Sequence, residues 1–218
     1  MSPSGTGHIP LALGGYTQLP RGMLGNAVTW LEMRAPFAQL PALERDDLSV
    51  QPLRGPEMPR YRDIFRILGE RWLWDARLRM DKVLLARLLD DPGVAAFALL
   101  LNGRDAGLLE LDFREAGSAE LAYFGVFDAL IGTGAGRWLM RVAVALAAAR
   151  DARRLWVHTC NFDHPGALGF YRRSGFTPYR CGFEVMRDPR LDGLLPRHAA
   201  PHVPLLEAAQ EPKSPIGR

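Results

Sequence analysis

The sequence predicts a mixed α/β fold, and three observations support this prediction. Short β-like runs alternate with segments of helical periodicity through most of the chain. Two neighbouring β-like runs are joined around Asn102-Gly103, as in an antiparallel hairpin. A later β-like run leads through a glycine-rich turn at residues 132–136 directly into a helix. A chain of 218 residues is long enough for one domain with a substantial hydrophobic core.

The composition narrows the functional classes. The apolar share of 48% and the charged share of 23% are those of a soluble globular protein. A net charge of +3 without a long run of Lys or Arg gives no support for nucleic-acid binding. The two cysteines, Cys160 and Cys181, are too few for a disulfide framework. The N-terminus lacks a signal-peptide pattern and the apolar run 142–149 is too short to span a bilayer, so we expect a cytoplasmic protein without membrane contact.

The first part of the chain predicts few regular elements. Residues 1–24 are rich in Gly, Pro and Ser, and we expect a flexible lead-in there. The β-branched and aromatic run 27–33 predicts a strand, and 48–53 predicts a second, short one. We expect residues 25–190 to form a single domain.

Two helices and a hairpin follow. Apolar residues recur at i, i+3, i+4 and i+7 after Pro59, which predicts a helix that ends at Gly69. Asp81 is a good helix cap, and the helix after it is stopped by Asp91-Pro92-Gly93. The hairpin pairs the apolar run 94–101 with 107–114.

The second half of the chain alternates strands with helices. The predicted elements are a strand at 119–127, a helix from about Gly136, a strand at 154–159, a helix from Pro165 to Ser174 and a strand at 176–184. Beyond Asp188 the sequence has no period, and we expect residues 195–218 to be a mostly disordered tail.

The turn Gly132-Thr133-Gly134-Ala135-Gly136-Arg137 predicts an anion-binding site. Alternating glycines let backbone N–H groups approach a ligand closely, and the helix that follows adds the positive end of its dipole. A Walker loop is excluded because no Gly-Lys-Ser/Thr follows, and a dinucleotide fingerprint because Arg137 stands where its third glycine belongs. On spacing alone, a loop that merely turns a corner is the alternative.

Further motifs resemble the GNAT superfamily of acyl-CoA N-acyltransferases. They are the strand that ends in Gly125-Val126, the turn Gly132-x-Gly134-x-Gly136 and the block Ala167-x-x-x-Tyr171-x-x-x-Gly175-Phe176. The resemblance is strong from 94 to 184 and weaker from 48 to 93. It implies a mostly antiparallel, splayed sheet of six or seven strands with helices on both faces. Ile131 stands where the family usually has Gln or Arg, and His164 where it usually has Asn.

The resemblance implies acetyl-CoA as co-substrate, with its pyrophosphate on the glycine turn and its pantetheine arm in the gap between the strands 119–127 and 154–159. The residues expected to contact it are Phe124, Val126, Phe127, Gly132, Thr133, Gly134, Ala135, Gly136, Arg137 and Asn161. Arg172 and Arg173 could meet phosphates as well, although a solvent-facing helix side explains them better.

Catalysis requires a proton donor for the departing thiolate and a proton acceptor for the amine. Tyr171 matches the family's general acid; a core tyrosine is the alternative. Glu110, Asp112 and Glu120 are the candidate bases, against the alternative of solvated edge carboxylates. Glu110 is favoured because its apolar neighbours would raise its pKa by desolvation.

The resemblance implies that the region between the first two helices covers the acceptor pocket, where Trp72, Trp74 and Arg77 lie, with Arg79 beside them. Arginine next to tryptophan suits an acceptor with a carboxylate or an aromatic part, although core tryptophans with solvated arginines explain the pattern too. No metal is expected, because His158, Cys160, Asp163 and His164 do not have a zinc spacing.

Two questions stay open at this stage. The chain could be an N-acetyltransferase for a small-molecule amine or a protein lysine, or an acyl-CoA-binding sensor without transferase activity. The family also ends in two strands, whereas this chain has one convincing strand after Gly175-Phe176. We expect the extra N-terminal strand to fill the empty sheet position, either within the chain or from a second copy in a homodimer.

Overall fold

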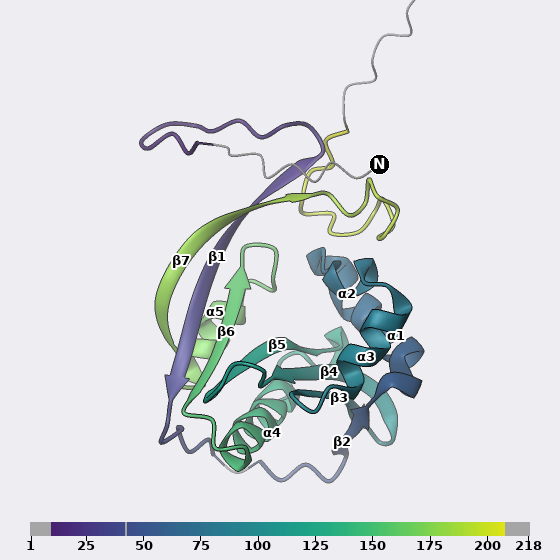
Figure 1. Ribbon diagram of the computed structural model, residues 1–218, viewed down its shortest axis with the longest axis vertical. Coiled ribbons are helices and arrows are strands. Elements are labelled where there is room, and N and C mark those ends of the chain that lie inside the picture. Colours follow the sequence, from purple (N-terminus) through teal and green to yellow (C-terminus); the bar gives the residue numbers. More distant parts are fainter. Residues whose placement is uncertain (1–9, 42, 208–218) are drawn as a thin grey trace, which may run out of the picture.

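A computed structural model describes residues 10–41 and 43–207 (Figure 1). Its seven strands form one sheet in the order β2-β3-β4-β5-β6-β1-β7. All neighbours are antiparallel except β5 and β6. The strands are β1 (Met23–Arg34), β2 (Leu48–Leu53), β3 (Val94–Leu101), β4 (Arg104–Asp112), β5 (Ser118–Val126), β6 (Arg154–Cys160) and β7 (Thr177–Arg187). The predicted mixed, mostly antiparallel sheet is confirmed.

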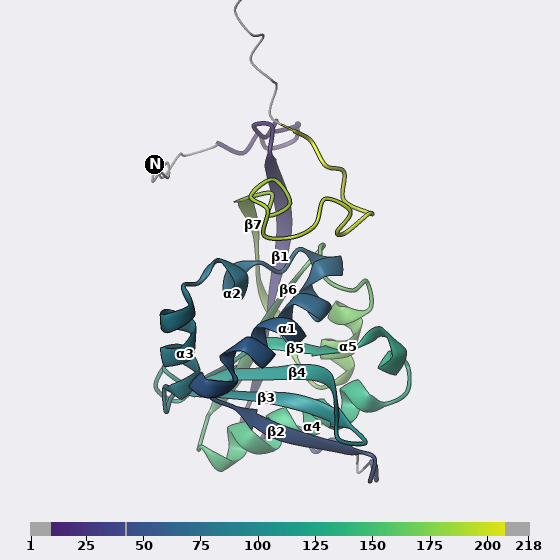
Figure 2. The ribbon, with the colours of Figure 1, turned by 90° about the vertical axis from the view of Figure 1, so that its right-hand side faces the viewer.

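Helices cover both faces of this sheet (Figure 2). One layer holds α1 (Met58–Gly69), α2 (Ala76–Arg79) and α3 (Lys82–Asp90), and the other holds α4 (Ala135–Ala149) and α5 (Ala167–Arg173). Strand side chains alternate between the two cores: Ala96 and Leu108 pack with α1, while Leu109 and Leu111 pack with α4. Both faces are buried, which is why β3 and β4 read as nearly continuous apolar runs.

The sheet splits between β5 and β6, as Figure 1 shows. The two strands pair only where Ser118–Glu120 meets Arg154–Trp156. Beyond that point β6 stays with β1, its antiparallel partner from Val28 to Arg34. Among residues 10–41 and 43–207, the second half of β5 therefore has no pairing strand on its β6 side.

The N-terminal strand β1 lies between β6 and β7 and pairs antiparallel with both. It takes the sheet position of the second strand that was expected after Gly175-Phe176. Of the two expected arrangements, the structure has the one within a single chain. Strand β1 begins at Met23, earlier than the predicted 27, and β7 extends to Arg187 rather than 184 because the two strands pair along their whole length.

The segment after β7 folds back on the domain. Arg190 is 3% exposed, and its guanidinium donates to Asp188 and to the carbonyl oxygens of Ala199 and Val203. Residues 195–207 are thus placed against the core, which differs from the predicted disorder because the sequence pattern does not reveal the buried arginine. Residues 208–218 lie outside the described part. None of the helices described is long and apolar enough to cross a membrane.

Candidate active site

One cavity of about 1160 Å³ runs through the split in the sheet. At one end it is lined by Gly132, Gly134, Gly136, Arg137 and the α4 residue Arg141, and we call this the turn end. At the other end it is lined by Trp72, Trp74, Asp75, Asn26 and Glu184, and we call this the tryptophan end. Between them lie the β5 residues Phe124 and Val126, with Phe127 directly after the strand, and the β6 residues Val157, His158 and Cys160.

Two of the predicted turn residues use their amides within the turn. The N–H of Thr133 donates to Leu130 O (3.2 Å), and the N–H of Ala135 points to the Thr133 hydroxyl (3.4 Å). Neither residue lines the cavity. Thr133 and Ala135 therefore shape the turn, and the prediction that they contact a ligand does not fit these contacts.

The remaining amides of the turn are open. In the part of the chain that the structure describes, no acceptor takes the N–H groups of Gly132, Gly134, Gly136 or Arg137. Gly132 (φ 81°) and Gly134 (φ 91°) are both left-handed, a conformation that glycine adopts without steric cost. Because Gly134 is the cap of α4, these amides sit at the positive end of the helix dipole. The turn end is therefore a backbone site for an anion.

Arg45, which the sequence did not single out, supports this turn. Its Nη1 donates to Thr133 O (3.0 Å), while Nε and Nη2 bind Asp47 (2.7 and 2.8 Å). A Cβ on Gly134 would lie 3.6 Å from Arg137 Nη2 and 4.0 Å from Arg45 Nη1. Two guanidinium groups thus flank the open amides. Arg45 lies in an irregular, proline-punctuated connection, so no local pattern could have identified it.

Tyr171 lies in the middle of the cavity wall. Its side chain is 7% exposed and packs edge-on against Phe124 and Phe170. Burial, with a smaller contribution from the charge of Asp163, raises the pKa of the Tyr171 hydroxyl well above its usual value of 10.0. The phenol therefore keeps its proton at any physiological pH and can act as a donor.

Asn161, predicted to contact the same ligand, does not line the cavity. Its Oδ1 accepts the N–H of Ala27 (2.6 Å), so the side chain ties β1 to the end of β6. That pairing partner is 134 residues away in the sequence and could not be foreseen.

Glu110, the favoured candidate base, is a structural residue. Its side chain is 1% exposed and does not line the cavity. Arg77 Nη2 donates to Oε1 (2.5 Å), and the hydroxyl of the buried Tyr61 donates to Oε2. The prediction was right about burial, but the carboxylate is neutralised by Arg77 and closed to an acceptor. Asp112 is likewise occupied, by Arg114 (Nη2–Oδ2 2.5 Å).

The third candidate base, Glu120, does not line the cavity but lies beside His158, which does. His158 lines the cavity, and its Nδ1 lies 3.5 Å from Glu120 Oε1. The nearby carboxylate of Glu120 raises the pKa of His158 above 6.5, although partial burial opposes this. A carboxylate that holds one ring nitrogen leaves the other free for proton transfer. His158 had been considered only as a metal ligand, because its partnership with Glu120 depends on the β5–β6 pairing.

The predicted acceptor residues separate. Trp72 lies edge-on between His164 and His202, and Trp74 donates its indole N–H to Asp163 Oδ1 (3.0 Å); both line the cavity. Arg77 does not, since its guanidinium is bound to Glu110 and lies 4.9 Å from the centre of the Tyr123 ring. These contacts give no support to the prediction that Arg77 binds an acceptor.

The sequence matches a known protein family, and the fold matches solved structures. The sequence profile of the Acetyltransferase (GNAT) family matches residues 61–176. Among curated proteins, no sequence matches. Solved structures of similar fold include a functionally unknown conserved protein from Staphylococcus epidermidis, which is 15% identical with a TM-score of 0.59 over 77% of this chain and 63% of that one.

Two further structures carry named activities. A GCN5-related N-acetyltransferase from Sphaerobacter thermophilus is 16% identical, with a TM-score of 0.53 over 77% of this chain and 51% of that one. An aminoglycoside acetyltransferase from an uncultured soil metagenomic sample is 19% identical, with a TM-score of 0.51 over 59% of this chain and 88% of that one. The present chain thus spans less than two thirds of the Staphylococcus and Sphaerobacter proteins. At these identities the likeness establishes the fold.

Proposed function

This chain belongs to the Acetyltransferase (GNAT) family, and we propose that it transfers an acetyl group from acetyl-CoA to a primary amine by direct attack in a ternary complex. One observation carries the proposal: a single cavity joins the open amides of the glycine turn to the tryptophan end through the split between β5 and β6. A cavity with two chemically different ends can hold two reactants at once and in contact.

The turn end suits the pyrophosphate of the co-substrate. Four open amides, the dipole of α4 and the guanidinium groups of Arg45 and Arg137 all favour a negatively charged group. Ile131, at the family's usual Gln or Arg position, is 45% exposed and leaves these amides unaffected. The pantetheine arm would then follow the unpaired half of β5, past Phe124 and Val126.

The residues in the middle of the cavity suit the two proton transfers. The amine nitrogen attacks the thioester carbonyl carbon, the carbon–sulfur bond breaks, and the thiolate leaves. Tyr171, which stays protonated, would donate its proton to the thiolate. His158, held by Glu120, would accept the proton that the amine loses.

The test is to mix the protein with acetyl-CoA and a panel of primary amines, and to follow release of the CoA thiol. We expect Tyr171→Phe to lower turnover tenfold or more, or about 1.4 kcal/mol, because it removes the proton donor while the ring still fills its site. Acetyl-CoA affinity, measured by calorimetry, should hold. Tyr179→Phe is the matched control, since Tyr179 is 44% exposed on the edge strand β7.

Three outcomes separate the alternatives. Thiol release that depends on Tyr171 supports the transferase. Unchanged turnover in Tyr171→Phe contradicts the role of Tyr171. Tight binding of acetyl-CoA without thiol release from any amine contradicts transfer and leaves the chain as an acyl-CoA-binding sensor.

A further inference from the structure

We propose that the acceptor is a multiply charged amine, and that Asp75 and Glu184 bind a cationic group on it other than the amine that reacts. This inference rests on the proposed function and names its substrate class. It concerns the tryptophan end of the cavity, where carboxylates and open acceptor atoms meet.

The two carboxylates reach this end from opposite sides. Asp75 precedes α2 in the helical layer, and its side chain is 12% exposed. Glu184 lies on β7, where it is directly opposite Asn26 of β1. Both line the cavity. Burial raises the pKa of Asp75, Arg79 opposes this increase, and the charge of Glu184 adds a small further increase. A cation placed between the two carboxylates would relieve their repulsion.

Their protein partners do not fully neutralise them. Asp75 Oδ2 accepts from Arg79 Nε (2.5 Å), but Arg79 also binds Asp192 (2.7 Å). Glu184 accepts a neutral hydrogen bond from Asn26 Nδ2 (3.1 Å), and no ion pair with it occurs among the described residues. Asp163, also on the cavity wall, accepts only from neutral donors, among them Trp74. Negative charge therefore exceeds positive charge at this end.

Asn26 adds an acceptor that no donor among the described residues satisfies. It is 4% exposed and lines the cavity, and its Oδ1 is buried without a hydrogen-bond partner. The orientation of the amide is fixed because Glu184 can only accept, so the NH₂ group must face it. A buried carbonyl oxygen without a donor is unfavourable. An ammonium brings three N–H donors and a positive charge, which suits Asn26 Oδ1 and the adjacent carboxylates together.

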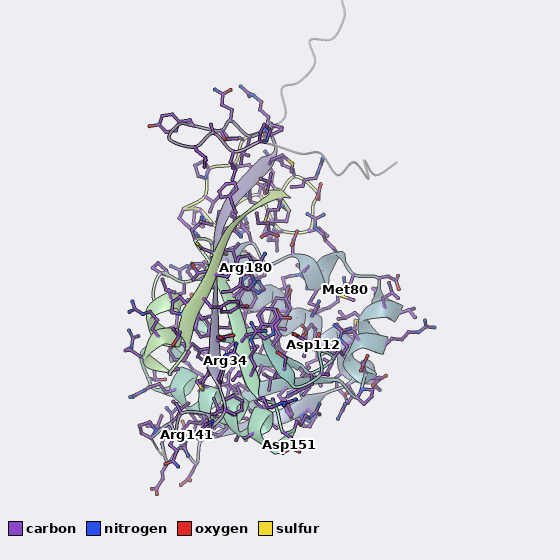
Figure 3. All side chains as sticks on the ribbon, turned by 60° about the vertical axis from the view of Figure 1, so that its left-hand side comes forward. Arg34, Met80, Asp112, Arg141, Asp151 and Arg180 are labelled. Carbon is purple, nitrogen blue, oxygen red and sulfur yellow. The ribbon has the colours of Figure 1, made fainter. Side chains whose placement is uncertain are left out.

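The arginines near this end are unavailable for an acidic substrate. Arg77 is bound to Glu110, Arg79 is shared by two carboxylates, and Arg71 pairs with Asp128 (3.0 Å). Arg180, labelled in Figure 3, lies over the ring of Trp30 (4.6 Å) and does not line the cavity. The acceptor with a carboxylate that the sequence suggested is therefore disfavoured.

The experiment compares acceptors with acetyl-CoA: the four-carbon compounds butylamine, 1,4-diaminobutane and 4-aminobutyrate, and the longer triamine spermidine. We expect kcat/KM for spermidine to exceed that for butylamine at least 30-fold, and 4-aminobutyrate to be the poorest acceptor. Glu184→Gln should lower kcat/KM for spermidine about tenfold and for butylamine less than threefold. The variant removes a carboxylate that binds the second cationic group, and butylamine has no such group. Asp63→Asn, an exposed carboxylate on α1, is the matched control and should change neither.

Equal kcat/KM for butylamine and spermidine, or an equal effect of Glu184→Gln on both, would overturn the inference while the transferase function stands. Absence of thiol release with every amine would instead contradict the proposed function. In that case, the binding of spermidine to the protein–CoA complex, monitored by tryptophan fluorescence, still tests whether Glu184 binds a cationic group. Binding weakened tenfold by Glu184→Gln supports it, and binding unaffected by the variant refutes it.

Discussion

The two ends of the cavity are built in different ways. The turn end comes from a contiguous stretch, residues 132–137, between β5 and α4, and it offers neutral backbone N–H groups. The tryptophan end is assembled from the loop before α2 and from β1 and β7, and it offers side-chain charges. A local site can be recognised from a short motif, whereas an assembled site exists only once the topology β6-β1-β7 is known.

This difference extends to what each end should tolerate. Backbone donors are fixed by the conformation of the turn, so only changes in backbone freedom should remove them. Side-chain charges depend on their neighbours, on pH and on salt. Perturbations that act on one end and spare the other test the comparison directly.

The largest effect is expected behind the tryptophan end, from Arg77→Met. This change leaves the carboxylate of Glu110, 1% exposed, without its counter-charge. Loss of one partner of a buried ion pair costs about 3–5 kcal/mol. We expect that loss in the free energy of unfolding, measured with urea, while acetyl-CoA affinity of the folded protein changes little.

Arg66→Met is the matched control, because Arg66 is 49% exposed and pairs with the exposed Asp63. It should cost less than about 1 kcal/mol. Equal stability of the two variants would contradict the structural role given to Glu110 and return it to the candidate bases.

A smaller effect is expected at the turn end, from Gly134→Val. At φ 91° a β-branched residue is strained, and its Cβ would face the guanidinium groups of Arg137 and Arg45. Strain of about 2 kcal/mol that is relieved by distorting the turn corresponds to a dissociation constant for acetyl-CoA raised about 30-fold.

Ile131→Ala is its control. Ile131 precedes the turn, is 45% exposed and contributes no open amide, so calorimetry should find less than a twofold change. If Ile131→Ala weakens binding as much as Gly134→Val, the side chain rather than the backbone holds the anion. The relative kcat/KM values among acceptor amines should be the same in both variants as in the wild type, because neither substitution touches the tryptophan end.

The sequence predicts the turn end in more detail than the tryptophan end, and the reason is physical. The glycine turn and Tyr171 are predicted from the sequence because each belongs to a motif whose spacing is local. Glu110 was placed correctly in an apolar stretch, but its partner Arg77 is 33 residues away and comes from another layer. The partnership was invisible, and so a buried ion pair resembled a desolvated base.

The same limit explains the residues that were missed. Glu184 and Asn26 become neighbours through a hydrogen bond that joins positions 158 apart in the sequence. Arg45 reaches Thr133 across 88 positions. The contact between Glu184 and Asn26 follows from the pairing of β1 with β7, which the sequence offered only as one of two possibilities.

The smallest effect is expected from the pair Glu120–His158, where the cavity joins the two ends. The carboxylate of Glu120, 3.5 Å from Nδ1, raises the pKa of His158 above 6.5. If His158 must be neutral to accept the proton of the amine, the acidic limb of kcat/KM lies above pH 6.5 in the wild type. Glu120→Gln should move that limb to lower pH, and His158→Gln should abolish it.

Stability gives an independent check with a defined sign. A group whose pKa is raised on folding stabilises the protein fully below its unfolded pKa and loses this contribution as pH rises through the folded pKa. The stabilisation from His158 should thus be present below pH 6.5 and fade above it, and Glu120→Gln should flatten that dependence. The side chain is 47% exposed, so the term should stay below about 1 kcal/mol. His198→Asn, on a histidine that is 82% exposed, should leave both profiles unchanged. An acidic limb that does not move in Glu120→Gln would mean that a residue other than His158 accepts the proton of the amine.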